Sequence, residues 1–386
     1  MRDFLQELKR FFRKGDMVLL VMCLFISAFS CLIIASTNNY REQGFLRYVL
    51  VQVAAIGLGT LLYAVFSSID LEFFAEHRRA LVIFSLGVLA LLIPFGTDLQ
   101  SGNKSWLAIP LLPFYIQPAE ICKISYILVA ASVMTSHQHN LSSFRSVIHM
   151  GTHLLLLVGT NILLSRDVGV SLIFVFIFLG MAFSGGVRLG WFLFGGGVIG
   201  AAWPLLWNYF FDPYQKRRIE SLYNPDIDPM GTGVRYHLKR SLDSLTGGGV
   251  TGQGLFNGNR TQAGALPAQH TDFIFSAIGE ELGYIGCFAV LVMLFALVAR
   301  CIWVGSRSPD YMRRMVCFGA AAALIFQIFV NVGMCIGVVP VIGLTLPLIS
   351  YGGSSTATIY AMLGLVSGVY ARPAPRSHER YIRPPR

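Results

Sequence analysis

An aspartate lies where a long polar segment of this sequence meets an apolar run. His270, Thr271 and Asp272 follow Pro267 and precede the apolar residues that begin at Phe273. A carboxylate at such a boundary is partly desolvated, which raises its pKa towards that of a useful general base. Thr271 or Asp272 could instead cap the helix that follows, because a helix N-terminus favours hydrogen-bond acceptors and anions. From this segment alone, Asp272 is a candidate base or a candidate cap.

Three more charged residues lie beside apolar runs. Glu120 and Lys123 are spaced i, i+3, so they share one face of a predicted helix and can pair. An isolated charge at membrane depth is costly, so the pair is expected either to face inward or to lie at the interface and fix the helix ends. Asp167 follows Arg166 and forms either a surface ion pair or part of the same outer cavity as Asp272.

Cations are concentrated in the polar segment that precedes Asp272. This segment, residues 212–272, is too long for an idle connection within a compact membrane bundle. A basic excess outside a membrane runs against the usual trend, which long loops partly escape. It fits an anionic ligand such as a diphosphate, although any one of these cations could also be a solvated charge. The basic residues are Lys216, Arg217, Arg218, Arg235, Lys239, Arg240 and Arg260.

Three other features of this segment bear on its role. Residues 234–246 have the periodicity of an amphipathic helix, which could lie flat on the membrane with its cations towards lipid head groups. Residues 247–252 match the G-x-G-x-x-G pattern, but no strand precedes them, so we reject a dinucleotide site. They form either a plain turn or a turn whose backbone N–H groups face a phosphate. His237 and His270 lack the tight spacing of zinc ligands, so zinc is not supported.

The composition indicates which elements must position these residues. Of 386 residues, 54% are hydrophobic and only 13% are charged, against roughly 25% charged residues in an ordinary soluble domain. The chain is therefore predicted to be an all-α polytopic membrane protein, since about 20 mostly apolar residues cross the hydrocarbon layer as a helix. The large polar segment falls between the seventh and eighth of about ten predicted spans. These are residues 17–36, 46–68, 80–95, 120–136, 148–164, 168–184, 187–211, 273–299, 315–338 and 355–371.

Charges at the two ends of the chain predict its orientation. Residues 1–16 form a basic leader without a cleavage site, which is either an amphipathic helix on the membrane surface or a topogenic signal. Residues 17–371 form a single membrane domain, and residues 372–386 form a basic tail. With both termini in the cytoplasm, the short basic loops also lie inside, as the positive-inside rule requires. The net charge of +10 is thus mostly topological, and no nucleic-acid partner is needed to explain it.

Two pairs of glycines predict close packing between helices. Gly196 and Gly200 are four residues apart, as are Gly364 and Gly368. Small residues at this spacing let transmembrane helices approach each other closely. Packing is the expected role of both pairs.

Several longer motifs occur in one order along the chain. They are Asp212-Pro213-Tyr214-Gln215-Lys216, Asp228-Pro229-Met230-Gly231, Tyr236-His237, Gly248-Gly249-Val250-Thr251-Gly252-Gln253-Gly254, Leu266-Pro267-Ala268-Gln269-His270-Thr271-Asp272-Phe273-Ile274-Phe275, Gly279-Glu280-Glu281-Leu282-Gly283, Asn331-Val332-Gly333-Met334 and Pro347-Leu348-Ile349-Ser350-Tyr351-Gly352-Gly353-Ser354-Ser355. This order closely resembles that of the shape, elongation, division and sporulation (SEDS) family, which includes RodA and FtsW. The resemblance covers essentially all ten predicted spans.

The resemblance implies a peptidoglycan glycosyltransferase that polymerises lipid II at the outer face of the bacterial plasma membrane. A class B penicillin-binding protein is the implied partner. The key catalytic aspartate of the family's His-Thr-Asp motif corresponds to Asp272, and three other family positions correspond to Glu120, Lys123 and Asp167. An α-linked donor and a β-1,4-linked product imply inversion by one displacement, with Asp272 as the base for the acceptor hydroxyl.

The other polar residues that the resemblance brings forward are expected to bind the substrate. Cations would stabilise the charge that develops on the diphosphate leaving group. A divalent cation, Mg²⁺ or Mn²⁺, could bridge the diphosphate, but nothing in the sequence forms a dedicated metal site. The predicted substrate-binding residues are Lys104, Glu120, Lys123, Asp167, Arg218, His237, Lys239, Arg240, His270 and Thr271.

Two functions of other classes stay open. A transporter of lipid-linked cell-wall precursors would need a polar route across the bilayer, for which the candidates at membrane depth are few: Glu120, Lys123, Gln327 and Asn331. A scaffold without enzymatic activity would only recruit the penicillin-binding protein. The motifs do not decide between the elongation, division and sporulation branches.

Overall fold

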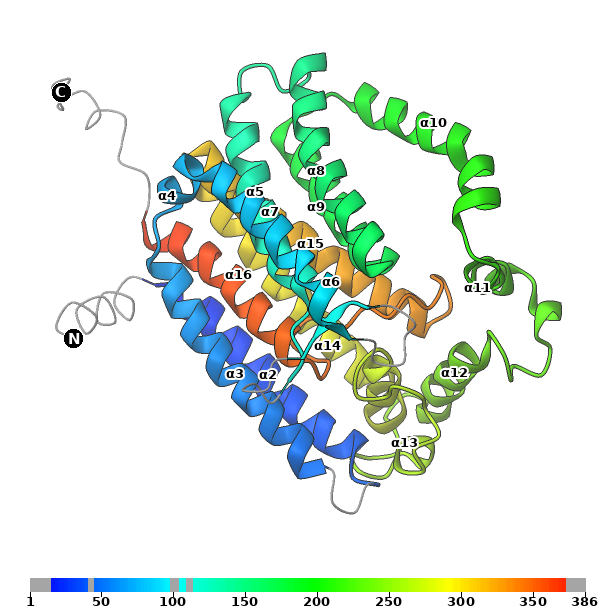
Figure 1. Ribbon diagram of the computed structural model, residues 1–386. Helices are drawn as coiled ribbons and strands as arrows, with labels where there is room; N and C mark the ends of the chain where they lie inside the picture. The colour runs from blue at the N-terminus through cyan, green and yellow to red at the C-terminus, as the bar shows by residue number, and fades with distance from the viewer. Residues whose placement is uncertain (1–14, 41–44, 98–103, 109–113, 373–386) are drawn as a thin grey trace, which may run out of the picture.

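The computed structural model describes residues 15–40, 45–97, 104–108 and 114–372, and these are mostly helical (Figure 1). The predicted leader and tail lie almost wholly outside the described residues. The long helices are α2 (Met17–Thr37), α3 (Phe45–Ser68), α5 (Arg78–Ala90), α7 (Pro118–Ser136), α8 (Phe144–Ser165), α9 (Val168–Gly185), α10 (Leu189–Leu205), α14 (Ile274–Arg307), α15 (Tyr311–Cys335) and α16 (Gly353–Ala371).

Shorter elements connect the long helices. Two short strands, β1 (Gly96–Thr97) and β2 (Trp106–Leu107), pair antiparallel between α6 and α7. The polar segment between α10 and α14 carries most of the short helices. The remaining elements are α4 (Leu71–Glu76), α6 (Leu92–Phe95), the π-helix η1 (Leu206–Phe210), α11 (Pro213–Tyr223), the 3₁₀-helix η2 (Pro225–Ile227), α12 (Tyr236–Gly248) and α13 (Asn259–Gln262).

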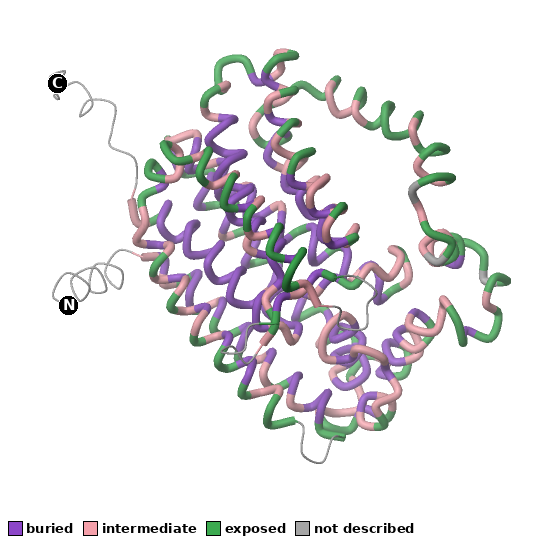
Figure 2. Tube along the Cα trace, viewed as in Figure 1, coloured by how far each residue is buried: buried purple, intermediate pink, exposed green. Residues whose placement is uncertain are grey.

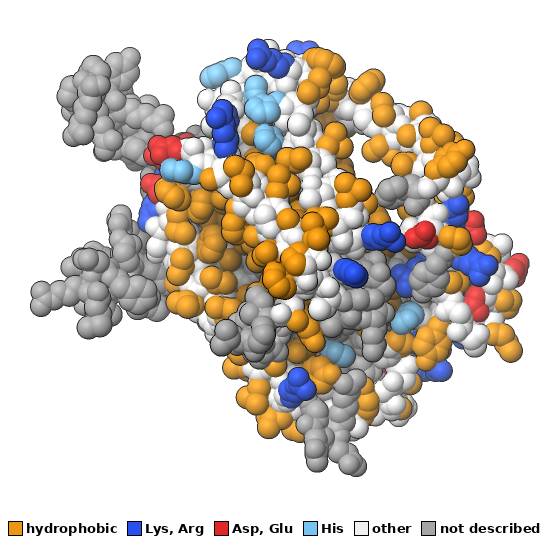
Figure 3. Space-filling model, viewed as in Figure 1, with side chains coloured by type: hydrophobic (Ala, Val, Ile, Leu, Met, Phe, Trp, Pro, Cys, Tyr) orange, Lys and Arg blue, Asp and Glu red, His pale blue; other side chains and the backbone are white. Residues whose placement is uncertain are grey.

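The long helices coincide with the predicted spans. Within the described part of the chain, nine helices are long and apolar enough to cross a membrane. α16 occupies the tenth predicted range, but it is rich in glycine, serine and threonine and is buried along nearly its whole length. Figure 3 shows hydrophobic side chains across the middle of the face in view, with Lys, Arg and His gathered at the upper end and charged groups again near α11. The protein is a multi-pass membrane protein.

Hydrogen bonds assign the helix termini to two ends of the bundle. At one end, the Arg300 guanidinium in α14 donates two hydrogen bonds of 2.9 Å to the Asp16 carboxylate, just before α2. At the other end, the Ser36 hydroxyl in the last turn of α2 donates to the Glu281 carboxylate near the start of α14. α2 and α14 therefore run in opposite directions. Asp272 precedes α14 at this second end, which we call the site end.

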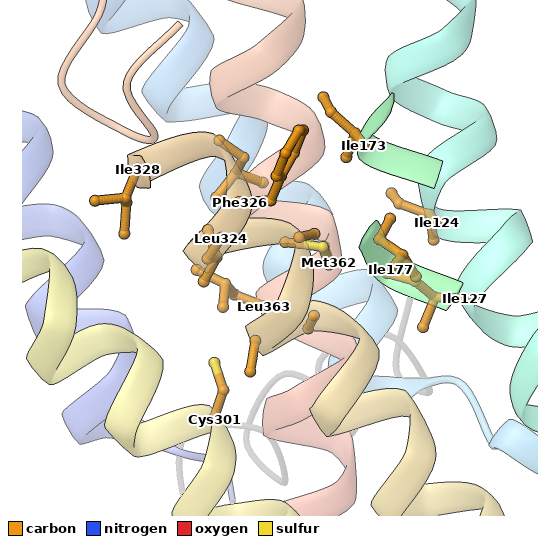
Figure 4. Close-up of a cluster of buried hydrophobic side chains, with 14 of the residues drawn as sticks. Ile124, Ile127, Ile173, Ile177, Cys301, Leu324, Phe326, Ile328, Met362 and Leu363 are labelled. Carbon is orange, nitrogen blue, oxygen red and sulfur yellow. The ribbon is translucent and has the colours of Figure 1, made fainter. Parts of the chain in front are cut away.

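Apolar side chains from five helices fill the centre of the bundle (Figure 4). α7 and α9 face α15, and α16 and α14 close the cluster from the other side. These buried side chains contact only other protein atoms, so the central helices pack at the density that is usual for protein interiors. The labelled residues are Ile124, Ile127, Ile173, Ile177, Cys301, Leu324, Phe326, Ile328, Met362 and Leu363.

One of the two predicted glycine contacts is present. A Cβ added to Gly364 would lie 2.6 Å from the Tyr63 carbonyl oxygen, and one added to Gly368 would lie 3.0 Å from that of Ser67. Only glycine allows α16 to approach α3 this closely, because any side chain would clash with backbone atoms. The prediction of close packing is confirmed for this pair.

α10 stands apart from the other long helices (Figures 1 and 2). It has no buried residue, and a Cβ added to Gly196 or Gly200 would meet no atom within 4 Å. The prediction of close packing at this pair is therefore wrong for this structure. Pro204 lies inside the helix, which continues as the π-helix η1; proline removes a backbone N–H donor, and such a helix often distorts next to it.

The amphipathic helix of the polar segment packs on protein. α12 buries Leu238 and Leu245, and its neighbours are α14 and α15. Its apolar stripe is covered by protein, because α14 and α15 supply the apolar surface that the stripe needs, and an orientation of its cations towards lipid head groups stays a prediction. Gly248 at its end allows a close approach: a Cβ there would lie 1.9 Å from the Gly279 carbonyl oxygen.

The glycine-rich segment after α12 forms a turn packed against the start of α14. The N–H groups of Gly252, Gln253 and Gly254 donate to the carbonyl oxygens of Gly248, Glu280 and Glu281 respectively. These three donors are therefore used within the protein and are not free for a phosphate. α14 itself is broken at Gly283, where the backbone has φ 67° and ψ −169°, so residues 274–282 form a separate helical segment at the site end.

Replacing Gly248 with alanine is expected to force α12 away from α14. The added Cβ would meet backbone atoms of Gly279 and Glu280 at 1.9 and 2.8 Å, and overpacking of this kind costs about 1–3 kcal/mol or more. Thermal unfolding in detergent measures the loss. Gly247→Ala is the matched control, because its Cβ would first meet the mobile guanidinium of Arg260. Equal unfolding temperatures for the two variants would contradict the expectation.

Candidate active site

Asp272 lies in the turn that precedes α14 and does not cap that helix. The N-cap position is Phe273, and no side chain makes a capping hydrogen bond there. The interpretation of Thr271 or Asp272 as a helix cap is therefore wrong. The turn begins at Ala268, whose carbonyl oxygen accepts hydrogen bonds from the N–H groups of Thr271 (3.1 Å) and Phe273 (3.2 Å). This tight turn leaves the Asp272 side chain available for another role.

Each carbonyl oxygen of the His-Thr-Asp motif accepts a hydrogen bond from the α15 to α16 region. The Tyr351 N–H donates to His270 (2.8 Å), and the Ser350 hydroxyl donates to Thr271 (2.6 Å). The third donor is the Asn331 amide, which reaches the Asp272 carbonyl (2.9 Å). The backbone of the motif is thus held at three successive positions. These donors lie in two motifs noted in the sequence, but only the structure links them to Asp272.

The Asp272 carboxylate itself has no hydrogen bond or ion pair with any described residue. A Cβ added to Gly343 would lie 3.5 Å from its Oδ2 atom, so only a glycine backbone faces it on that side. The pKa of Asp272 is raised to about 6, first by burial and then by the charge of Asp167, while Arg218 opposes the shift. The sequence predicted a raised pKa, and the direction is confirmed. An uncommitted carboxylate with this pKa can accept a proton near neutral pH.

Asp167 lies close enough to Asp272 to influence its pKa and belongs to the same site. Its Oδ1 atom accepts the Val170 N–H (3.1 Å) and caps α9, and its Oδ2 atom accepts the Gln117 amide (3.3 Å). Burial raises the pKa of Asp167, and the capping bond partly offsets this. No ion pair joins it to Arg166 in the described structure, so the surface-pair interpretation is wrong. Gln117 was not predicted as a site residue, although it precedes Pro118 directly before α7.

The Glu120–Lys123 pair forms and faces inward. The Lys123 Nζ atom lies 2.8 Å from Glu120 Oε2, and the two side chains are only 3% and 4% exposed. The negative charge of Glu120 also raises the pKa of Asp167. The pair is therefore part of the charged environment at the site end and not an exposed interfacial clamp.

Arg218 and His237 come to the site from the polar segment. The Arg218 guanidinium in α11 donates to the Val341 carbonyl oxygen (2.9 Å) and influences the pKa of both Asp272 and His237. The His237 ring in α12 stacks on Phe273, with centroids 5.9 Å apart. Burial lowers the pKa of His237, and Arg218 lowers it further. His237 is thus favoured as a neutral ring beside the turn of Asp272.

His270 and Thr271 have contacts that stabilise the turn. The His270 ring lies edge-on to Tyr48, with centroids 5.0 Å apart, and tilted against Tyr351 at 5.6 Å. The Thr271 hydroxyl donates to the Ala268 carbonyl (3.2 Å). These contacts support a positioning role, and their predicted substrate contacts stay predictions.

No hydrogen bond or ion pair between described residues joins three of the predicted cations to Asp272. Lys239 is exposed and donates to the carbonyl oxygen of Met230 (3.0 Å), which precedes α12 in the polar segment. Arg240 lies over the Tyr236 ring of the same helix, 5.5 Å from its centroid. Lys104 is exposed just before β2. None of these contacts joins a cation to Asp272.

Comparison with known proteins shows that this chain is similar to proteins of cell-wall synthesis. A family model described as cell cycle protein matches residues 15–373. The peptidoglycan glycosyltransferase MrdB of Escherichia coli (strain K12) is 30% identical over 359 residues, which cover 92% of this chain and 93% of that protein. The stage V sporulation protein E of Bacillus subtilis (strain 168) is 28% identical, with coverages of 92% and 96%.

Two solved structures share the fold. A chain from a structure titled as a peptidoglycan synthase complex that coordinates polymerization and crosslinking superposes with a TM-score of 0.74, at 28% identity and with coverage of 96% of this chain and 99% of that chain. The rod shape determining protein RodA of Thermus thermophilus superposes with a TM-score of 0.66, at 26% identity and with coverages of 94% and 98%. Both likenesses extend over nearly the whole length of the chains.

Proposed function

Because this chain belongs to the FtsW, RodA and SpoVE family of cell cycle proteins, we propose that it polymerises lipid II with the Asp272 carboxylate as general base. Curated relatives carry the name peptidoglycan glycosyltransferase, and this chain is a peptidoglycan glycosyltransferase as well. The observation that carries the assignment of the base is the Asp272 carboxylate, which is held by its backbone and lacks any hydrogen bond or ion pair with the described residues.

The chemistry is a single inverting displacement. The acceptor 4-hydroxyl attacks the anomeric carbon of the donor, a glycosidic C–O bond forms, and the bond to the diphosphate breaks. Asp272 takes the hydroxyl proton, and the negative charge goes to the diphosphate. The charge of Arg218 acts on Asp272, so we propose it as the main protein cation for that charge. Lys104, Lys239 and Arg240 are not among the charges that shift the pKa of Asp272, so we assign them no step.

A divalent cation would fit this site only together with the substrate. The described residues contain no group of three or more His, Cys, Asp or Glu side chains able to hold a metal ion. Asp272 and Asp167 offer two carboxylates, whereas Mg²⁺ and Mn²⁺ prefer about six oxygen ligands. We propose that Mg²⁺ or Mn²⁺ bound to the diphosphate supplies further charge neutralisation there, with the diphosphate providing much of its coordination.

We propose the same partner and location as for the family. A class B penicillin-binding protein would crosslink the strands that this chain polymerises, and the similarity to a chain of a peptidoglycan synthase complex supports this. The bacterial plasma membrane, with both termini in the cytoplasm, would place the site end on the outer face, where lipid II is presented. The basic residues of the short loops support this orientation.

The polymerisation assay tests the proposal directly. Purified protein is incubated with lipid II, with and without a co-expressed class B penicillin-binding protein, and the glycan strands are separated on a gel. Strand formation is expected. Movement of lipid II across vesicle bilayers without strand formation would instead support a transporter. The absence of both activities would support a scaffold that only recruits the penicillin-binding protein.

The polymerisation rate is expected to fall below a pH of about 6. Asp272 acts as a base only when ionised, and its pKa is raised to about 6, so each pH unit below that value lowers kcat/KM about tenfold. The measurement is kcat/KM from about pH 5 to about pH 8, with folded protein monitored at each point. A kcat/KM that stays constant from about pH 8 down to about pH 5, as expected for an aspartate with the ordinary pKa of about 3.9, would contradict the assignment.

A further inference from the structure

We propose that Asn331 is a positioning residue for Asp272, a role that rests on the proposed function of Asp272 as the base. Asn331 lies in α15 and is fully buried. Its single Nδ2 group donates two hydrogen bonds, one to the Asp272 carbonyl (2.9 Å) and one to the Leu344 carbonyl (2.7 Å). One amide thus joins the backbone of the base to the segment between α15 and α16, residues 336–352, which we call the strap.

The strap contacts both charged side chains to which we assign a step, Arg218 and Asp272. Its Val341 carbonyl accepts the hydrogen bond from Arg218 (2.9 Å), and its Gly343 faces the Asp272 carboxylate. By holding the strap and Asp272 together, Asn331 sets the base relative to the cation proposed for the diphosphate. The strap has no regular secondary structure, so individual hydrogen bonds such as this one help to fix its position. A displacement of about 1 Å between reacting groups can lower the rate about 100-fold.

The structural contribution of the Asn331 side chain lies in its two hydrogen-bond donors rather than in its packing. Its Oδ1 atom is buried without a hydrogen-bond partner in the described structure, and an unsatisfied buried acceptor costs about 1–3 kcal/mol. A leucine of similar shape would avoid this cost. The two N–H hydrogen bonds to the carbonyl oxygens of Asp272 and Leu344 offset the cost of the unpartnered Oδ1 atom. A residue kept only to fill the core would not need them.

α15 provides its own matched control. Gln327 lies one turn before Asn331 on the same helix, is 1% exposed, and also has a buried amide oxygen without a partner. Its side chain donates no hydrogen bond to Asp272 or to the strap among the described residues. Gln327→Leu and Asn331→Leu therefore make the same chemical change at two buried positions, and only the second removes a bond to the base.

The test compares the kinetics of the two leucine variants with the wild type in the lipid II polymerisation assay. Asn331→Leu is expected to lower kcat about 10- to 100-fold, with KM for lipid II changed by less than about threefold and lipid II binding preserved. Gln327→Leu is expected to keep a kcat within about threefold of the wild type. Asn331→Ser, whose hydroxyl is too short to make both bonds, is the second variant in case the leucine variant does not fold.

The outcomes separate this inference from the proposed function. If the wild type polymerises lipid II and Asp272→Ala does not, but Asn331→Leu and Asn331→Ser match Gln327→Leu in kcat, then the positioning role is wrong and the base assignment stands. A rise in KM alone would also overturn the positioning role, because it would indicate a substrate contact. If the wild type itself forms no strands with its partner present, the proposed function fails first.

Discussion

Asp272→Ala is expected to lower the rate of strand formation from lipid II about 10²- to 10⁴-fold, the usual contribution of a general base. The variant removes a carboxylate whose backbone carbonyl is held by Asn331 and which has no hydrogen bond or ion pair with the described residues. Asp272→Asn is expected to have nearly the same effect, since the amide keeps the shape but cannot accept the hydroxyl proton. The rates are measured with purified protein under saturating lipid II.

Folding and partner binding are the controls for this result. The side chain of Asp272 makes no hydrogen bond to a described residue, so both variants are expected to insert, to fold and to bind the penicillin-binding protein. Asp226→Ala, which removes an exposed carboxylate from the same polar segment, is expected to polymerise at the wild-type rate. Strand formation by Asp272→Ala at the rate of Asp226→Ala would refute the catalytic assignment.

Lys123→Met is expected to destabilise the protein by about 3–5 kcal/mol, the usual effect of leaving one member of a buried ion pair without its partner. Glu120 is 3% exposed, and its charge acts on the nearby Asp167. Removal of the Lys123 ammonium therefore leaves two acidic groups without a compensating cation. Thermal unfolding in detergent, read as a shift of the midpoint, measures the effect.

The double variant Glu120→Gln/Lys123→Met separates charge from packing. It removes both charges, so it is expected to recover much of the lost stability, because the remaining cost is only that of altered packing. Asp70→Asn is the control for a long pair with one partner in water: Asp70 lies 3.8 Å from Arg313, with side chains 51% and 10% exposed, and we expect a loss of only about 1 kcal/mol or less. A double variant as unstable as Lys123→Met would show that the buried charge is not the cause.

The positions of the long helices could be predicted from the sequence because hydropathy over about 20 residues is a local property. The Glu120–Lys123 pair was predictable for the same reason, since a spacing of three residues on a helix places both side chains on one face. The periodicity also predicted a helix at α12. It could not show which surface covers its apolar stripe, because lipid and α14 are equally apolar partners for Leu238 and Leu245.

The predictions of close packing at Gly196 and Gly200 and of a helix cap at Asp272 were wrong for the same physical reason. The glycine spacing of Gly196 and Gly200 is the same as that of Gly364 and Gly368, but only the second pair meets a neighbouring helix. Likewise, an aspartate before an apolar run has the sequence of a helix cap, whereas the turn that starts at Ala268 moves the N-cap to Phe273. Local patterns describe what a residue is able to do, and the neighbouring elements select one of these possibilities.

The sequence by itself determined the class of protein, the ranges of its long apolar helices, the family, and Asp272 as the candidate base. Only the tertiary structure decided which groups surround that carboxylate. Asp167, Arg218 and Asn331 are far from it in sequence and come together because α9, α11 and α15 converge with the strap at the site end. Burial and through-space charge depend on distance in space and not along the chain, so no local pattern could have assembled this environment.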